Sequence, residues 1–317
     1  MQEARQVELR KALKEINLSL NQVNKQARNY IQDVLLIINK EIGVEKILSI
    51  ILFGSQLNNN HGKNESTQIS DCDLLIIFSD NVSNFFIRRV EKYFYSLENK
   101  HNFRYIHSNL FDRVIGVVQQ STGMFMSHFL THKTYFEQGI FHKIFGVNRF
   151  LSGVFAPKKL VLSSVVDNSQ VLWGEDLRDL VKTKVEISTF DMIRSTIMNL
   201  LISLFSILIT PLKIFKAKYQ LEAVKWALRA SNFFAFEDSK PLSAIIKRFI
   251  LFERSESNLR RAKNFYAKFL HLRKNPHVDL NFMLRCPFRI IKIHVKGILL
   301  KKLMRRKRRT SQHRLSS

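Results

Sequence analysis

IILFGS (residues 50–55) and SDCDLLIIF (residues 70–78) decide the fold of this chain. Each contains an apolar run beside turn-forming residues, which predicts two buried strands. Side chains alternate between the two faces of a strand, so Asp71 and Asp73 are expected on one face and Cys72 on the other. Two carboxylates this close repel each other unless a cation lies between them. Their hard oxygen atoms favour Mg²⁺.

Gly54 and Ser55 follow the first predicted strand. A glycine at this point lets the backbone approach a phosphate group closely, because it has no side chain. The following N–H groups and the serine hydroxyl can then donate hydrogen bonds to the phosphate. The sequence therefore predicts a phosphate site beside a metal site.

The order of these features resembles the nucleotidyltransferase superfamily of DNA polymerase beta, and within it the kanamycin and minimal nucleotidyltransferases. The resemblance implies that Gly54 and Ser55 hold a triphosphate while Asp71 and Asp73 bind Mg²⁺. It covers about residues 46–180. The implied fold class is α/β (α+β), with a small mixed sheet flanked by helices and followed by a helical bundle.

The loop between the two motifs contains two further matches to the family. Gly62 resembles its loop glycine, and Ser70 resembles the serine before the first aspartate. The polar linker 56–70 is longer than in the minimal members, which suggests a mobile loop over the site.

A third carboxylate completes the site in active members of the family, where it helps bind metal and deprotonate the attacking hydroxyl. Between residues 98 and 137 the one acid is Asp112, which precedes a strand predicted at 114–118. Asp112 is either that carboxylate or a solvated turn residue, and Gln119 or Gln120 could mark its replacement by an amide. Without it, the chain would be a catalytically degenerate nucleotide-binding or RNA-binding adaptor on the same fold.

Composition is that of a globular protein with room for two domains, at 317 residues, 45% hydrophobic and 24% charged. The 2 cysteines, Cys72 and Cys286, exclude a disulfide framework and predict a reducing compartment. The first residues have no apolar stretch typical of a secretory signal. We therefore expect a cytoplasmic protein.

Four parts are predicted along the chain. They are N-terminal helices at 1–45, a nucleotidyltransferase domain at 46–185, a helical domain at 186–275 and a basic amphipathic tail at 276–317. Apolar periodicity predicts one broken helix or two helices over 2–42.

Two elements are predicted inside the second part. The first is a helix over 84–97, with Phe85, Phe86, Val90 and Phe94 facing inward. The second is a helix, turn and strand passage that ends at Gly174.

His128 and His132 lie at the spacing of one helical turn, which could bind a transition metal. No cysteine lies nearby and the next histidine, His142, is too far along the chain to share the same face. We assign these histidines to half-buried or exposed positions, and the surrounding phenylalanines to packing.

Residues 197–209 are almost entirely apolar. Because the run falls short of the ~20 residues that span a bilayer, we expect a buried central helix of a bundle. Its apolar side is formed by Ile193, Ile197, Leu200, Leu201, Leu204 and Leu208. Lys225 and Arg229 could reach a triphosphate, but we expect charges on a solvated helix face.

The formal net charge of +25 is concentrated near the end of the sequence. Residues 280–317 have no acid and twelve basic residues, interleaved with branched apolar residues. A helix of this kind could bind RNA or an anionic membrane, or act only as a solvating tail.

The expected reaction is transfer of a nucleoside monophosphate from a Mg²⁺-bound nucleoside triphosphate, with ATP as the expected donor. The acceptor is a hydroxyl group of a small molecule, an RNA end or a protein. In such chemistry the protein mainly positions groups and neutralises charge.

Overall fold

The computed structural model describes residues 2–20, 23, 25–54, 72–101, 103, 127–167, 169–182, 187–209, 218–238, 240–253 and 255–315. The chain divides into two compact units. The N-terminal unit comprises Met1–Val154 and Val161–Glu186, and the C-terminal unit comprises Phe155–Leu160 and Ile187–Ser317. The division into four parts drawn from the sequence stays a prediction.

A four-stranded mixed sheet forms the centre of the N-terminal unit, in the order β3-β2-β1-β4. The strands are β1 (Ile47–Phe53), β2 (Asp73–Phe78), β3 (His128–His132) and β4 (Ser169–Gly174). β1 runs antiparallel to both β2 and β4, whereas β2 and β3 are parallel. The two strands predicted from the opening motifs are therefore the two inner strands of the sheet.

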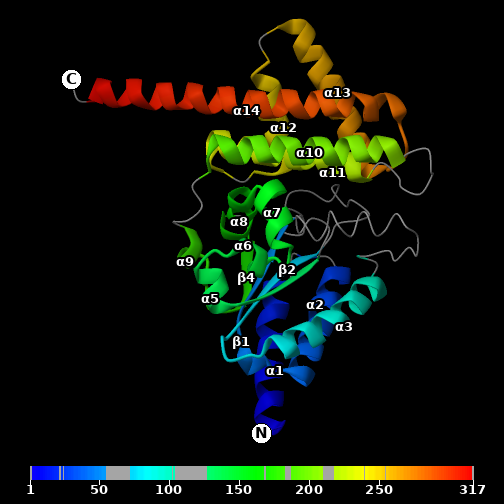
Figure 1. Cartoon of the computed structure of the whole chain (residues 1–317), viewed down its shortest axis with the longest axis vertical. Coiled ribbons are helices and arrows are strands. Elements are labelled where there is room, and N and C mark those ends of the chain that lie inside the picture. The colour runs from blue at the N-terminus through cyan, green and yellow to red at the C-terminus, as the bar shows by residue number, and fades with distance from the viewer. Residues whose placement is uncertain are drawn as a thin grey trace. The chain divides into compact units, whose positions relative to one another are not determined.

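Three helices cover one face of this sheet: α1 (Gln2–Ser19), α2 (Lys25–Glu41) and α3 (Asn84–Lys100) (Figure 1). Their apolar sides form one core with Leu52 of β1 and with Leu74 and Ile76 of β2. A short 3-10 helix, η1 (Val44–Lys46), leads into β1. Of the two alternatives predicted over 2–42, one broken helix or two helices, the structure has two helices.

The opposite face of the sheet carries aromatic side chains. Phe129 of β3 lies with its ring centroid 5.8 Å from that of Phe53 and 5.0 Å from that of Phe145. The short helices α5 (Lys133–Glu137) and α6 (Phe141–Ile144) contact β3. After α6 come α7 (Arg149–Phe155) and α8 (Lys158–Asp167), and β4 is followed by α9 (Asp179–Lys182).

α3 confirms the helix predicted over 84–97, and Ser83 caps it by accepting a hydrogen bond from the backbone N–H of Phe85. Val90 and Phe94 are buried as expected. Phe85 and Phe86 are exposed, which corrects the prediction. The buried side of the helix is formed by Ile87, Val90, Phe94, Leu97 and Glu98, and it leaves the two phenylalanines of the first turn outside.

Five helices form the described part of the C-terminal unit beyond residue 186. They are α10 (Thr189–Ile209), α11 (Lys218–Phe236), α12 (Leu242–Leu251), α13 (Glu256–Lys274) and α14 (Leu280–Leu315). α10, α11 and α14 contact one another pairwise, and Figure 1 shows them lying side by side. The predicted fold class, a small mixed sheet with helices followed by a helical region, is confirmed.

α10 forms where predicted, but its apolar side does not face the interior. Ile193, Ile197, Leu201, Leu204 and Leu208 are 47% to 75% exposed, which corrects the expectation of a buried central helix. The buried side of α10 combines Met192, Met198 and Ile202 with the polar residues Ser195, Asn199, Ser203 and Ser206. By length and composition α10 is the one described helix able to cross a membrane, and such a helix alone is weak evidence for a membrane.

Candidate active site

The candidate site lies where β1 ends and β2 begins. Phe53, the last residue of β1, pairs with Asp73, the first residue of β2. Gly54 follows with φ +84°, a left-handed conformation that is favourable for glycine and strained for other residues. The backbone therefore turns sharply beside the Asp73 carboxylate.

A side chain at position 54 would also force the Asp73 side chain to move. A Cβ atom at position 54 would overlap the carboxylate oxygen Oδ2 of Asp73. Because glycine has no side chain, the carboxylate packs directly over the backbone at the end of β1. An acidic group and a bare turn of backbone thus lie in contact at this edge of the sheet.

Asp73 and Cys72 have different surroundings. Cys72 is fully buried in the core beneath α1, α2 and α3, together with Leu74. Asp73 is partly exposed, and alternation along β2 places it on the opposite face of the sheet from Leu74.

Several residues predicted for the site lie outside the described residues. They are Ser55, Gly62, Ser70, Asp71 and Asp112, together with the strand predicted at 114–118. Gly54 and Asp73 are the two predicted site residues that the structure places, and it brings them into contact.

β4 adds a third strand end beside the site. Phe53 pairs with Ser169 on its other side, so Asp73, Phe53 and Ser169 form a row across the sheet. Side chains of directly paired residues lie on the same face. The start of β4 is therefore a neighbour of the candidate site.

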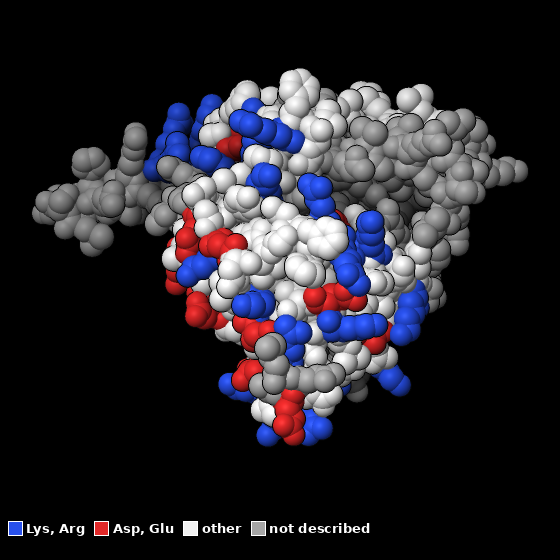
Figure 2. Space-filling model, turned by 60° about the horizontal axis from the view of Figure 1, so that its bottom comes forward, with Lys and Arg blue, Asp and Glu red and all other residues white. Residues whose placement is uncertain are grey.

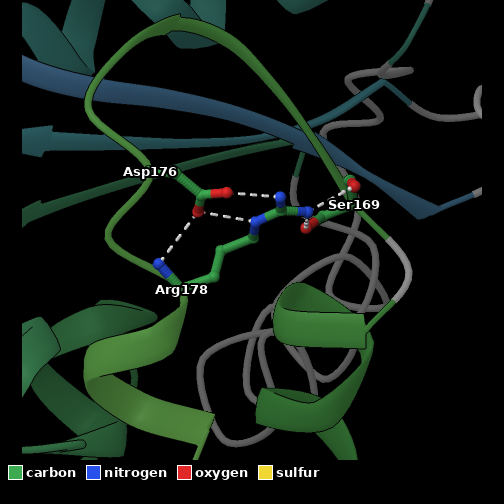
Figure 3. A network of polar contacts seen from close by, with 3 residues as sticks. All are labelled: Ser169, Asp176 and Arg178. Atoms are coloured by element: carbon green, nitrogen blue, oxygen red, sulfur yellow. Dashed lines mark hydrogen bonds and ion pairs between the residues drawn. The ribbon is translucent and has the colours of Figure 1, made fainter.

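Arg178 fixes this strand end (Figure 3). Its Nη1 donates to the carbonyl oxygen of Ser169 at 2.8 Å and to the Ser169 hydroxyl at 3.3 Å. Its Nε and Nη2 donate to the two carboxylate oxygens of Asp176 at 2.7 Å and 2.5 Å. The hydrogen bonds that Arg178 donates to Asp176 raise the pKa of Arg178 above its usual value. With its donors used in this way, Arg178 is a clamp between the start of β4 and the loop that follows it.

Mg²⁺ binding was predicted for Asp71 and Asp73. A carboxylate at the start of β2, beside a bare backbone turn, is a ligand of the kind that Mg²⁺ prefers, so Asp73 fits that ion in chemistry and position. Within the described part of the chain, no group of three or more His, Cys, Asp or Glu residues is placed to hold a metal ion.

Glu98 of α3 and His128 of β3 form a buried pair that was not predicted from the sequence. His128 Nδ1 lies 2.7 Å from Glu98 Oε1, and the two side chains are 1% and 3% exposed. The backbone N–H of Ser127 also donates to Glu98 Oε1 at 3.3 Å. No pattern in the sequence indicates this pairing, because the two residues lie 30 positions apart.

The buried pair belongs to the core and not to the candidate site. His128 pairs with Leu74 in the β2–β3 ladder, so it lies on the face covered by α3, opposite Asp73. Its ring packs edge-on against Phe94 at a centroid distance of 5.1 Å. Glu98 therefore connects α3 to the sheet and is not a third carboxylate for Asp73.

His128 and His132 lie in a strand, which corrects the helical spacing assumed from the sequence. Both are buried, not half-exposed. His132 Nε2 donates to the carbonyl oxygen of Val82 at 2.7 Å. The two histidines have separate partners, Glu98 for His128 and the carbonyl group of Val82 for His132.

Lys225 of α11 is a core cation, which corrects its assignment to a solvated face. It forms an ion pair with Glu222, and Arg273 Nη1 lies 3.2 Å from another oxygen of the same carboxylate. Burial is the largest influence on Lys225, and it lowers the pKa of the amine. The group therefore holds α11 and α13 together.

No family model matches this sequence, and no curated protein sequence matches it. Among solved structures, the chain is similar to the spectinomycin adenyltransferase AAD(9) from Enterococcus faecialis, crystallised with ATP and spectinomycin. The identity is 9% and the TM-score 0.47, with 85% of this chain and 98% of that chain covered. A likeness at this level does not identify the reaction of this chain.

Proposed function

We propose that the N-terminal unit is a nucleotidyltransferase domain, which transfers a nucleoside monophosphate from ATP or another nucleoside triphosphate to a hydroxyl group. The observation that carries this proposal is the contact between Gly54 and Asp73. It brings a backbone turn suited to phosphate together with a carboxylate suited to Mg²⁺.

Each residue of the motif has a proposed role. Gly54 and Ser55 bind the triphosphate through backbone N–H groups and the serine hydroxyl. Asp71 and Asp73 hold Mg²⁺, which when bound neutralises charge on the triphosphate. Asp112 is the proposed third carboxylate.

The proposed reaction is an in-line displacement. The acceptor oxygen forms a bond to the α-phosphorus, and the bond from that phosphorus to the oxygen bridging to the β-phosphate breaks. Pyrophosphate leaves, and the hydroxyl proton passes to a base, for which we propose Asp112. The chain contributes mainly by holding the donor and acceptor in line. We place this reaction in the cytoplasm.

Asp73→Asn tests the proposal. The amide keeps the size of the side chain but removes the negative charge that attracts a cation. We expect at least tenfold weaker binding of ATP in the presence of Mg²⁺ and loss of pyrophosphate release across a panel of hydroxyl acceptors. Glu15→Gln is the matched control, because Glu15 is an exposed acid on α1 of the same unit.

Two other outcomes separate the alternatives. Mg²⁺-dependent ATP binding that Asp73→Asn abolishes, without pyrophosphate release from any acceptor, would identify the catalytically degenerate adaptor on the same fold. Undiminished ATP binding and turnover in Asp73→Asn would contradict the proposed site itself.

A further inference from the structure

α14 carries a row of large apolar side chains on its outer side, which we call the outer stripe. Its members are 39% to 76% exposed. They are Leu280, Leu284, Phe288, Ile291, Val295, Leu299 and Leu303. Their spacing of three or four residues keeps them on one side of the helix over more than six turns.

The outer stripe is separate from the side of α14 that packs within the C-terminal unit. The packed side includes Met283, Cys286, Ile290, Ile293 and Leu300, all buried. At about 100° per residue, these positions lie roughly opposite the outer stripe. Packing within the C-terminal unit therefore does not explain why the residues of the outer stripe are apolar.

α10 repeats this arrangement. Its exposed apolar side chains are Phe190, Ile193, Ile197, Leu201, Leu204 and Leu208. α10 contacts both α14 and α11. Two helices that touch each other thus both direct large apolar residues outward.

The contacts among α10, α11 and α14 include several polar bonds beside buried apolar side chains such as Met198, Val224 and Ile290. Asn199 Nδ2 donates to His294 Nε2 at 3.3 Å, and the Nδ1 atom of His294 lies 3.2 Å from the Ser231 hydroxyl. Gln220 donates to the Ser203 hydroxyl at 2.6 Å. A Cβ atom at Gly297 would lie 2.7 Å from the Cβ atom of Ser231. The inner side of α14 is thus already occupied by partners within the unit, whereas the outer stripe is exposed.

Charge indicates which partner covers the outer stripe. Residues 280–317 have twelve basic residues and no acid. Lys302, Arg305 and Arg306 are exposed around the C-terminal end of the outer stripe. The N-terminal unit differs, because acidic and basic side chains are interspersed over the face shown in Figure 2.

An anionic lipid surface fits both properties. A second copy of α14 would bring like charges together, and a nucleic acid would leave the apolar side chains without a partner. Lipid headgroups attract the basic residues, and the acyl chains below them accept the apolar side chains. We propose that α14 lies in the plane of an anionic membrane surface, with the outer stripe inserted among the lipids. This proposal is independent of the nucleotidyltransferase assignment.

Point variants of the full chain test the proposal, because the inner side of α14 is part of the core and truncation would disrupt the unit. Phe288→Ser combined with Leu299→Ser removes apolar area from the outer stripe. We expect at least a tenfold loss of cosedimentation with vesicles of phosphatidylcholine and phosphatidylglycerol. Phe85→Ser is the matched control, because Phe85 of α3 is 68% exposed and Phe288 is 76% exposed. Thermal unfolding verifies that each variant is folded.

A second set of variants separates charge from apolar insertion. Charge reversal at Lys302, Arg305 and Arg306 should remove the preference for anionic over neutral vesicles. A polarity-sensitive dye on Phe288→Cys should shift to shorter wavelength with anionic vesicles, whereas the same dye on Phe85→Cys should not. Both native cysteines are buried, so labelling is directed to the introduced thiol.

Three results would overturn the proposal. The first is equal vesicle binding by the native protein and the Phe288→Ser, Leu299→Ser variant. The second is RNA binding that depends on the basic residues, without vesicle binding, which would indicate a nucleic-acid surface. The third is self-association that the apolar variant abolishes, without vesicle binding, which would indicate an interface between copies.

Discussion

The Asp73 carboxylate occupies the space in which a side chain at Gly54 would lie. Gly54→Ala therefore has two costs: backbone strain at φ +84° and displacement of Asp73. The strain alone is about 1 to 2 kcal/mol. We expect lower stability in urea unfolding and at least tenfold weaker Mg²⁺-dependent ATP binding.

Gly146→Ala separates the two costs of the Gly54 substitution. Gly146 also has a positive φ, +60°, but a Cβ atom there would meet no atom within 4 Å. Gly146→Ala should lose stability through strain and retain ATP binding. Equal ATP affinity in the two variants would contradict the role of Gly54 in the site.

The buried Glu98–His128 pair should contribute to stability and not to nucleotide binding. Glu98→Gln weakens a buried hydrogen bond to His128 and should lower the free energy of unfolding by about 1 to 3 kcal/mol. The measurement is urea denaturation, with Glu91→Gln on the same helix as the control. A large loss of ATP affinity in folded Glu98→Gln would place Glu98 in the site, against the face of the sheet on which it lies.

Arg178→Gln should loosen the start of β4. The substitution removes the paired contact with Asp176 and the hydrogen bonds to Ser169. Because the Asp176 side chain is half-exposed, we expect a cost of about 1 kcal/mol. Amide hydrogen exchange should increase in β4 and remain unchanged in α13. Unchanged exchange in β4 would show that the strand end does not depend on the clamp.

The C-terminal unit should lose stability in acid through His294. Burial lowers the pKa of this histidine to about 3, compared with 6.5 for the free side chain. Between these values the unfolded chain binds a proton that the folded chain does not, so stability falls as the pH decreases from about 6.5 to 3. The slope approaches about 1.4 kcal/mol per pH unit.

His294→Asn tests this origin of the acid sensitivity. The variant should lose that part of the slope, whereas His277→Asn, at an exposed histidine, should keep it. Urea denaturation at a series of pH values measures the effect. An unchanged slope in His294→Asn would assign the acid sensitivity to other groups.

Local sequence was sufficient to predict the two inner strands of the sheet. The apolar runs that end at Phe53 and begin after Asp73 form strands because β-branched and aromatic residues favour an extended, buried backbone. The helices α1, α2 and α3 follow from apolar periodicity. Strand preference and apolar periodicity are short-range properties, so neighbouring residues are enough to predict these elements.

β3 was missed because the burial of its polar residues depends on a distant partner. His128 is buried through Glu98, which lies 30 residues earlier in the chain. Lys225 lies in the core because its ion pair with Glu222 compensates its charge. Sequence periodicity assigns charged residues to the solvated side of an element. It therefore does not predict the burial of a charged residue whose partner lies far away in the sequence.

The sequence by itself determined that α10 and α14 are helices with apolar sides, and that α14 is strongly basic. Only the tertiary structure decided which sides are covered. The inner contacts of α10 use Asn199 and Ser203, while Ile197 and Leu201 face outward. An apolar stripe has the same spacing whether it meets a protein core or an outside surface. Its role is decided by the hydrogen bonds and shapes of the helices packed beside it, which lie far away in the sequence.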